Sequence, residues 1–328
     1  MLGRMEKPIP YDVVIVGGGP AGLSAALNLG RARKRVALFD AGPPRNAEAA
    51  HINGFVTRDG TPPAEFRRIG REQLRTYPGV HVREAAVESI AREGELFVVR
   101  VGEERIEARR VLLGVGMIDV MPDLPGFREL WGKSIFQCPF CHGWEIQDRP
   151  FGVLATSLML VEFSLFLTGW SRDIVVFTGG AVDIPAELRA RLASAGVVVE
   201  ERPIRALRAR EDGYLDAVEL VGGEAVAREA IFTRTAQRQT ALVSSLDLAL
   251  DEQGYVRVDD HKATSVAGIY AAGDLTTMMQ TALMAAAAGA MAAAMMSHGL
   301  TTEALGRSPL SPALSPKFGG KGGEPEQR

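Results

Sequence analysis

A strand, a glycine-rich turn and a helix follow one another near the start of the chain, and this order restricts the fold more than any other segment does. In "YDVVIVGGGPAGLSAALNLGR" the apolar run 11–16 predicts a buried strand, and a helix is expected from residue 20 onward. A second apolar strand, "RVALFD", follows at 35–40. This succession predicts a Rossmann-type α/β unit that binds a dinucleotide.

The residues of the turn match the physical requirements of such a site. In the GxGxxG pattern, the first glycine permits the tight turn, the second lets the backbone approach a pyrophosphate, and the third lets the helix pack on the strand. The helix start directs its N–H groups at the phosphates, and an acid at the end of the second strand can bind a ribose hydroxyl. The expected cofactor-binding residues here are Gly17, Gly19, Pro20, Ala21, Gly22 and Asp40.

Composition sets the size of the protein and narrows its partners. With 328 residues, of which 46% are hydrophobic and 23% charged, the chain is long enough for about two domains of ordinary soluble composition. A net charge of −3 predicts no long basic surface, so neither nucleic acid nor an anionic membrane is an expected partner. The segment before residue 11 lacks the features of a signal peptide, so we expect a cytoplasmic protein.

One uncharged segment, residues 275–297, is long enough to cross a membrane. It consists mostly of alanine, with interspersed threonines, a glutamine and a glycine, so its hydropathy falls well short of that of a leucine-rich membrane span. We therefore expect a buried helix whose small side chains allow close packing.

Both cysteines of the chain lie in "FQCPFCHGWEI", residues 136–146, three positions apart and followed directly by a histidine. The CxxCH pattern also occurs where haem is attached covalently. Zinc would require four ligands, whereas the chain has two cysteines and five scattered histidines, so no metal ligand is assigned. A passive pair of buried thiols and a redox-active dithiol are the remaining interpretations of the motif.

A second glycine motif lies near the end of the chain, where a strand at 268–272 precedes Gly273-Asp274 in "GIYAAGDLTTMMQTALM". Together with the first fingerprint and "VLLGVG" at 111–116, it resembles the low-molecular-weight thioredoxin reductase family of flavoproteins, over nearly all of residues 11–298. The resemblance implies FAD as the cofactor. In that family the aspartate of the GD motif contacts the ribityl and phosphate region of FAD, and the next helix directs its N-terminus at the flavin. The implied site includes Gly273, Asp274, Gln280 and Thr281.

The same resemblance implies an α/β fold with two Rossmann-like three-layer domains. The FAD domain is expected to be discontinuous, formed by 1–118 and 247–304. A degenerate domain of the pyridine-nucleotide type, which carries the CxxC, is expected as an insert at 119–246. Residues 305–328 are rich in Pro, Gly and Ser and are expected to be a disordered tail. The family also implies a homodimer.

In this family the CxxC is an active disulfide, and thiol chemistry explains its spacing. Two intervening residues let a disulfide close at a helix N-terminus, whose dipole lowers the pKa of the first thiol. By resemblance, Cys138 is the interchange thiol that meets the substrate, and Cys141 faces the flavin. The reductases have an aspartate after the second cysteine. Here it is His142, which is expected to titrate nearer neutrality and is the candidate acid/base group, with Glu145 as a second choice.

The sequence departs from the reductases where they carry a second glycine fingerprint, for NADPH. After the predicted strand 151–154 the chain has "ATSLML", residues 155–160, and so lacks the glycine that lets the backbone approach the pyrophosphate. After the next strand, "DIVVF", it has "TGG" without the arginine pair that holds the 2′-phosphate. NADPH binding in the usual manner is therefore not expected.

Without NADPH, electrons are expected to run from a substrate dithiol to the flavin. The segments "CPFCHGWE" and "DAGPPRN…HINGF…DGTPP" look like those of the FAD-dependent dithiol oxidases that close disulfides in natural products such as gliotoxin, holomycin and romidepsin. Within that group the romidepsin type is our preferred assignment. Asn46 and Asn53 are expected near the flavin or the substrate opening, and His51 is either a proton-transfer residue or a plain loop residue.

Three functions are therefore compared. The first is a dithiol oxidase that acts on a small-molecule dithiol, with oxygen or NADP⁺ as the final acceptor. The second is a reductase of a thioredoxin-like protein, supplied by NADPH through an unusual site or by another donor. The third is a flavin-bound redox sensor whose dithiol acts as a switch. Consumption of a dithiol with oxygen, reduction of thioredoxin, and a slow single turnover would distinguish them.

Overall fold

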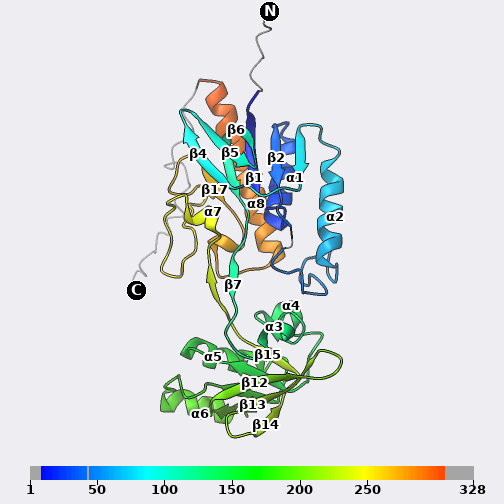
Figure 1. The fold of residues 1–328 in the computed structure, drawn as a ribbon, viewed down its shortest axis with the longest axis vertical. Coiled ribbons are helices and arrows are strands. Elements are labelled where there is room, and N and C mark those ends of the chain that lie inside the picture. Colours follow the sequence, from blue (N-terminus) through cyan, green and yellow to red (C-terminus); the bar gives the residue numbers. More distant parts are fainter. Residues whose placement is uncertain (1–8, 43, 307–328) are drawn as a thin grey trace, which may run out of the picture.

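The computed structural model describes residues 9–42 and 44–306, which form two lobes joined at a narrow waist (Figure 1). The two ends of the described chain lie in the larger lobe, and the middle of the chain forms the smaller one. The expected α/β architecture with parallel sheets is confirmed. The expected disordered tail, 305–328, lies outside the described residues except for its first two.

The larger domain is built on a seven-stranded sheet. Its parallel part has the order β3 (Val80–Arg83), β2 (Val36–Phe39), β1 (Tyr11–Val16), β6 (Glu104–Leu113), β17 (Ile269–Ala271). The first half of β6 pairs antiparallel with β5 (Leu96–Val101), which pairs with β4 (Ser89–Glu93). The carboxyl end of β1, where open α/β sheets bind their ligands, points towards the waist (Figure 1).

Two apolar cores cover the two faces of this sheet. Side chains alternate along β1, so that Val13 and Ile15 face one core while Val14 and Val16 face the other. The first core also contains residues of the helices α1 (Pro20–Arg31), α2 (Pro63–Leu74) and α8 (Ala282–Ala304). The second core is covered by the β4–β5 hairpin and by the segment around α7 (Ala241–Ser244).

Small residues allow α8 to pack closely along α1. A Cβ at Gly289 would clash with the carbonyl oxygen of Ala21. The helix begins at Ala282, later than expected, because Asp274–Thr276 (η1) forms a 3₁₀ turn. Within the described residues α8 is the one helix that is long and apolar enough to cross a membrane. Packing against the domain explains this composition, since it buries Ala285, Ala286, Gly289, Ala292, Ala293, Met296 and Leu300.

The smaller domain is a second three-layer α/β unit. Its parallel sheet has the order β11 (Val198–Glu200), β10 (Ile174–Phe177), β9 (Phe151–Leu154), β15 (Ala230–Phe232), β8 (Ile135–Phe136). One face packs on α5 (Leu158–Leu167) and α6 (Ala186–Ser194). The other packs on α3 (Phe127–Leu130) and on an antiparallel sheet of β12 (Ile204–Ala209), β13 (Leu215–Leu220) and β14 (Ala225–Ala227).

The chain crosses between the domains twice, through β7 (Ile118–Val120) and β16 (Ala236–Arg238), which pair antiparallel. The insert was expected to extend to residue 246. However, α7 packs in the core of the larger domain through Val243, because the chain re-enters that domain as soon as β16 ends. The second crossing is therefore at β16.

Candidate active site

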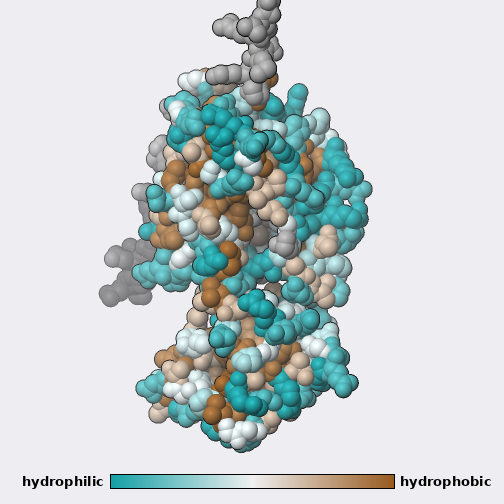
Figure 2. All heavy atoms as spheres, viewed as in Figure 1, coloured by the Kyte–Doolittle hydropathy of each residue, from teal (hydrophilic) through white to brown (hydrophobic). Residues whose placement is uncertain are grey.

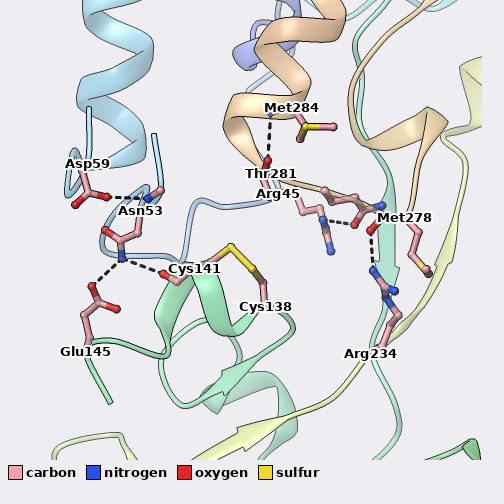
Figure 3. The surroundings of a disulfide bond; sticks show 12 residues. Arg45, Asn53, Asp59, Cys138, Cys141, Glu145, Arg234, Met278, Thr281 and Met284 are labelled. Carbon is pink, nitrogen blue, oxygen red and sulfur yellow. Dashed lines mark hydrogen bonds between the residues drawn. A yellow bond between two sulfur atoms is a disulfide. The ribbon is translucent and has the colours of Figure 1, made fainter. Parts of the chain in front are cut away.

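The two cysteines form a disulfide on the edge of the smaller domain that faces the larger one (Figure 3). Cys138 is the N-cap of α4 (Pro139–His142), Cys141 lies within α4, and their Cα atoms are 5.3 Å apart. The ring of Pro139 suits the first helical position, where an N–H would have no partner. Because α4 is a single turn, the helix dipole expected at Cys138 is reduced to a few N–H groups.

The ring nitrogens of His142 are buried beside the disulfide. The ring stacks on Phe136, with centroids 4.3 Å apart and an interplanar angle of 20°. Neither nitrogen has a hydrogen-bond partner among the described residues. Burial lowers the pKa of His142 from 6.5 to about 4, below the near-neutral value expected from the sequence, because a charged ring would lose its hydration. At neutral pH the ring is uncharged, and burial makes it a weaker base than a solvent-exposed histidine.

Acidification should reveal this burial as a loss of stability. The folded pKa of about 4 lies below the ordinary 6.5, so the unfolded state binds more protons between these values and the free energy of unfolding falls as the pH drops. His142→Phe keeps an aromatic ring on Phe136 and removes the proton site. We expect the loss of stability between pH 7 and pH 4.5 to shrink by about 2 kcal/mol in urea unfolding. His51→Phe, at an exposed histidine, is the control, and an equal change in both variants would assign the titration elsewhere.

The glycine turn between β1 and α1 forms an open cradle. A Cβ at Gly17 would clash with the carbonyl oxygen of Gly114, and one at Gly22 would clash with that of Gly17. At Gly19, by contrast, no atom of the other described residues, its chain neighbours excepted, lies within 4 Å of the position that a Cβ would take. Gly19 is also the N-cap of α1 without a side-chain capping bond, which leaves N–H groups of the first turn available to an anion. The residues present therefore fit a pyrophosphate.

Asp40, expected at a ribose, is buried at the end of β2. Its Oδ2 accepts hydrogen bonds from Arg67 and from Arg71 of α2, the second at 2.6 Å. Burial raises the pKa of Asp40, but the two guanidinium groups outweigh this and hold it below its ordinary 3.8. Asp40 is therefore ionised, and its Oδ1 accepts no hydrogen bond from the described residues and is available to a hydroxyl donor.

The residues predicted after β17 lie in and beside η1 and at the N-terminus of α8. Gly273 has a φ of 93°, a conformation that glycine adopts readily. Burial raises the pKa of Asp274 above 3.8, although the nearby Arg45 opposes the shift. Thr281 caps α8 by accepting a hydrogen bond from the N–H of Met284 at 3.2 Å. Figure 3 shows Thr281, at this end of α8, above the disulfide. Hydrogen bonds from Arg45 to Asp274 and Asp119, and from Gln137 to Asp119, connect the Asp274 region to the segment next to Cys138.

Arg45 connects several parts of this site, although it was not expected from the sequence. Its guanidinium donates to Asp119 at 2.6 and 3.0 Å, to Gln280 Oε1 at 2.7 Å and to Asp274 Oδ2 at 3.2 Å. These partners are between 74 and 235 positions away in the sequence. The short "PPRN" segment offered the one available signal for Arg45, and no local pattern marks Asp119.

The loop between β2 and α2 contacts the disulfide segment directly. Asn53 donates from Nδ2 to the carbonyl oxygen of Cys141 at 2.9 Å and to Glu145 Oε1 at 3.1 Å (Figure 3). In this structure Asn53, expected at the flavin or the substrate opening, thus holds the CxxC turn. Asn46 is half-buried on the same loop, and His51 is exposed.

The β9–α5 unit has the geometry of a second nucleotide site but not its residues. In the first turn of α5, Leu158 is 42% and Met159 53% exposed, so two apolar side chains reach the surface at the end of the helix that a pyrophosphate would approach. The turn that follows β10 contains no arginine between residues 178 and 185. The structure therefore offers no usual clamp for NADPH at this unit.

These features define a two-domain α/β protein with a disulfide placed between its two nucleotide-type units. Residues 11–289 match the family described as pyridine nucleotide-disulphide oxidoreductases, and the chain belongs to this family. The expected relation to thioredoxin reductase-like flavoproteins is confirmed.

Individual relatives cover different shares of the chain. Thioredoxin reductase tcpT of Claviceps purpurea is 31% identical over 313 residues, which cover 92% of this chain and 98% of the relative. A probable thioredoxin reductase of Arthroderma benhamiae is 37% identical over 177 residues, 52% of this chain and less than half, 44%, of that relative. The solved structure of HlmI is 36% identical with a TM-score of 0.85, covering 90% of this chain and 94% of HlmI.

Proposed function

We propose that the protein is an FAD-dependent dithiol oxidase that forms an intramolecular disulfide in a small-molecule dithiol of natural-product type. One combination of features carries the proposal. A disulfide lies at the domain junction, and the second nucleotide-type unit, β9–α5, presents apolar side chains where a cofactor would bind. Because Leu158 and Met159 reach the surface there, the substrate rather than NADPH supplies the electrons. The similarity to HlmI over most of the chain supports the branch of FAD-dependent dithiol oxidases within the family.

FAD is the proposed cofactor because the cradle residues fit it. Gly19 and the first turn of α1 would hold the pyrophosphate, Asp40 the ribose, and Asp274 the ribityl and phosphate region. When bound, the flavin would take two electrons from the enzyme dithiol and pass them to oxygen.

Cys138 and Cys141 carry out the exchange with the substrate. One substrate thiolate attacks Sγ of Cys138, which breaks the enzyme disulfide and releases Cys141 as a thiolate. The second substrate thiol then attacks the substrate sulfur of the mixed disulfide and displaces Cys138. The substrate disulfide closes, and the enzyme pair has gained two electrons and two protons.

An aromatic surface beside the disulfide suits an apolar small molecule. Phe140, between the two cysteines, is 71% exposed, and Trp144 is 73% exposed. Phe140 packs on Phe166 and Trp170 at centroid distances of 5.8 and 5.6 Å, which fixes its position. Hydrophobic residues also reach the surface beside the waist (Figure 2), including Val120 of β7. Such surfaces favour substrates that bury apolar area on binding.

Flavin absorbance under anaerobic conditions tests this function. Dithiothreitol should bleach the oxidised flavin band rapidly, admission of air should restore it, and NADPH should leave it unchanged. Rapid bleaching by NADPH would instead establish the alternative function, reduction of a thioredoxin-like protein, which relatives named thioredoxin reductase favour. Bleaching by dithiothreitol that NADP⁺ reverses and oxygen does not would identify NADP⁺ as the acceptor.

We also propose that the protein is a homodimer, as the family implies. On its outer side α8 exposes a stripe that comprises Leu283, Met284, Ala287, Met291 and Ala294. A second copy of the chain would cover these apolar side chains. Sedimentation equilibrium tests this, because a monomer at micromolar concentration would contradict it.

A further inference from the structure

A buried polar cluster lies where the chain crosses between the domains. The carboxylate of Asp119 in β7 is 5% exposed and accepts hydrogen bonds from four side chains. Arg45 donates twice, and Gln137, Thr235 and Gln237 donate once each, at 3.3, 3.0 and 2.9 Å. We name this set, completed by the glutamine described next, the junction cluster: Arg45, Asp119, Gln137, Thr235, Gln237 and Gln280.

The cluster draws its members from both sides of the junction. Arg45 and Gln280 belong to the larger domain, Gln237 to the second crossing strand, and Gln137 to the smaller domain. Gln280 closes the cluster, because it accepts from Arg45 at 2.7 Å and donates to Gln237 at 2.8 Å. A buried carboxylate is tolerated only while its donors stay in place. The cluster therefore resists movement of one domain relative to the other.

The junction cluster also reaches the two reacting centres. Arg45 contacts Asp274, the residue assigned to the cofactor, at 3.2 Å. Gln137 directly precedes Cys138 in the chain. On the other side of the disulfide, Asn53 of the larger domain holds the carbonyl oxygen of Cys141 at 2.9 Å. The larger domain thus contacts the disulfide segment directly at Cys141 and indirectly, through Arg45 and Asp119, at Gln137.

We propose that Arg45 and Asp119 are positioning residues that hold the smaller domain at the orientation in which the Cys138–Cys141 pair delivers its electrons to the flavin. This inference rests on the proposed function and adds to it the residues that set the geometry of electron delivery. Transfer between bound groups depends steeply on their placement, and an error of about 1 Å lowers such rates by about 100-fold.

Asp119→Asn is the variant that tests the proposal. The asparagine keeps the side-chain size but turns an NH₂ group towards several N–H donors and leaves Arg45 without its carboxylate. We expect amide hydrogen exchange to become at least about tenfold faster at 118–120 and 236–238, measured without substrate. Anaerobic bleaching of the flavin by dithiothreitol should become about 10- to 100-fold slower. The reaction of the reduced protein with an aromatic disulfide, which reports the accessible thiol alone, should keep its rate.

Asp173→Asn is the matched control, because Asp173 accepts from Arg228 at 2.6 Å entirely within the smaller domain. It should change neither the exchange at the crossing strands nor the bleaching rate. If Asp119→Asn fails to fold, Arg45→Lys keeps the charge but loses the paired hydrogen bonds to Asp119, and both readouts should move in the same direction.

Two results would overturn the positioning role. Faster exchange with unchanged bleaching would make the cluster structural only, and slower bleaching with unchanged exchange would show that orientation is not what changed. If dithiothreitol does not bleach the wild-type flavin, the proposed function fails, and the exchange measurement alone decides whether the cluster holds the domains.

Discussion

Cys138→Ser and Cys141→Ser are each expected to lower dithiol oxidation on the order of a thousandfold or more while the protein retains its flavin. The disulfide is the one group in the proposed reaction that can exchange with a substrate thiol and also face the cofactor. The cradle at Gly19 and the carboxylate of Asp274 lie on the larger domain and do not depend on either sulfur. Visible absorbance measures whether each variant retains its flavin. Oxygen uptake with dithiothreitol measures the rate of dithiol oxidation.

The two serine variants should also differ from each other. Cys141→Ser leaves Cys138 as a free thiol that can attack an added aromatic disulfide, releasing one aromatic thiolate and keeping the other half as a mixed disulfide, which mass spectrometry of the intact protein would detect. Cys138→Ser should show no such adduct, because the thiol that meets the substrate is gone. Normal turnover by either variant would refute the relay, and adducts that form on Cys141 instead would reverse the assigned order of the two cysteines.

Gly19→Val should weaken FAD binding by about 100-fold, which corresponds to about 3 kcal/mol, with little effect on the fold of the cofactor-free protein. Among the residues that the structure describes, none except the chain neighbours comes within 4 Å of a Cβ at Gly19, and its extended backbone accepts a branched residue. The new side chain would occupy the space that a pyrophosphate needs. Titration of FAD into the cofactor-free protein, followed by flavin fluorescence, gives the affinity, and thermal unfolding gives the stability.

Gly22→Ala is the contrasting variant. Its Cβ would clash with the carbonyl oxygen of Gly17 inside the protein, so it should lower the melting temperature even without FAD. If Gly19→Val bound FAD as tightly as the wild type, the cradle would not be the pyrophosphate site. If it also unfolded early, Gly19 would have a packing role that the open space around it does not predict.

The local parts of the site could be predicted because the residues of each motif lie close together in the sequence. Gly17, Gly19 and Gly22 have their spacing set by one turn, and β1 and α1 occupy the expected positions around them. The cysteines needed one further turn of chain to meet, and a three-residue separation is enough. In such short segments, the geometry of one turn of backbone is enough to determine where each side chain lies from its spacing in the sequence.

The junction could not be predicted, because its geometry depends on how two domains pack. Arg45, Asp119 and Gln280 come from three distant segments, and no periodicity relates them. The pKa of His142 depends in the same way on burial against Phe136, which the CxxCH string does not encode. The start of α8 was expected too early because charge content does not distinguish a 3₁₀ turn from an α-helix.

The antiparallel pairing of β7 with β16 has a consequence for the ancestry of the chain. Val120 and Ala236 are direct partners, so the smaller domain leaves and re-enters the larger one at neighbouring points. Topologically, the whole insert is the loop of a single β-hairpin whose two arms are the crossing strands. A domain gained at such a place requires no rearrangement of the host sheet. The larger domain therefore accommodates the insert beside its own sheet, and the turn at Gly19 lies outside the insert.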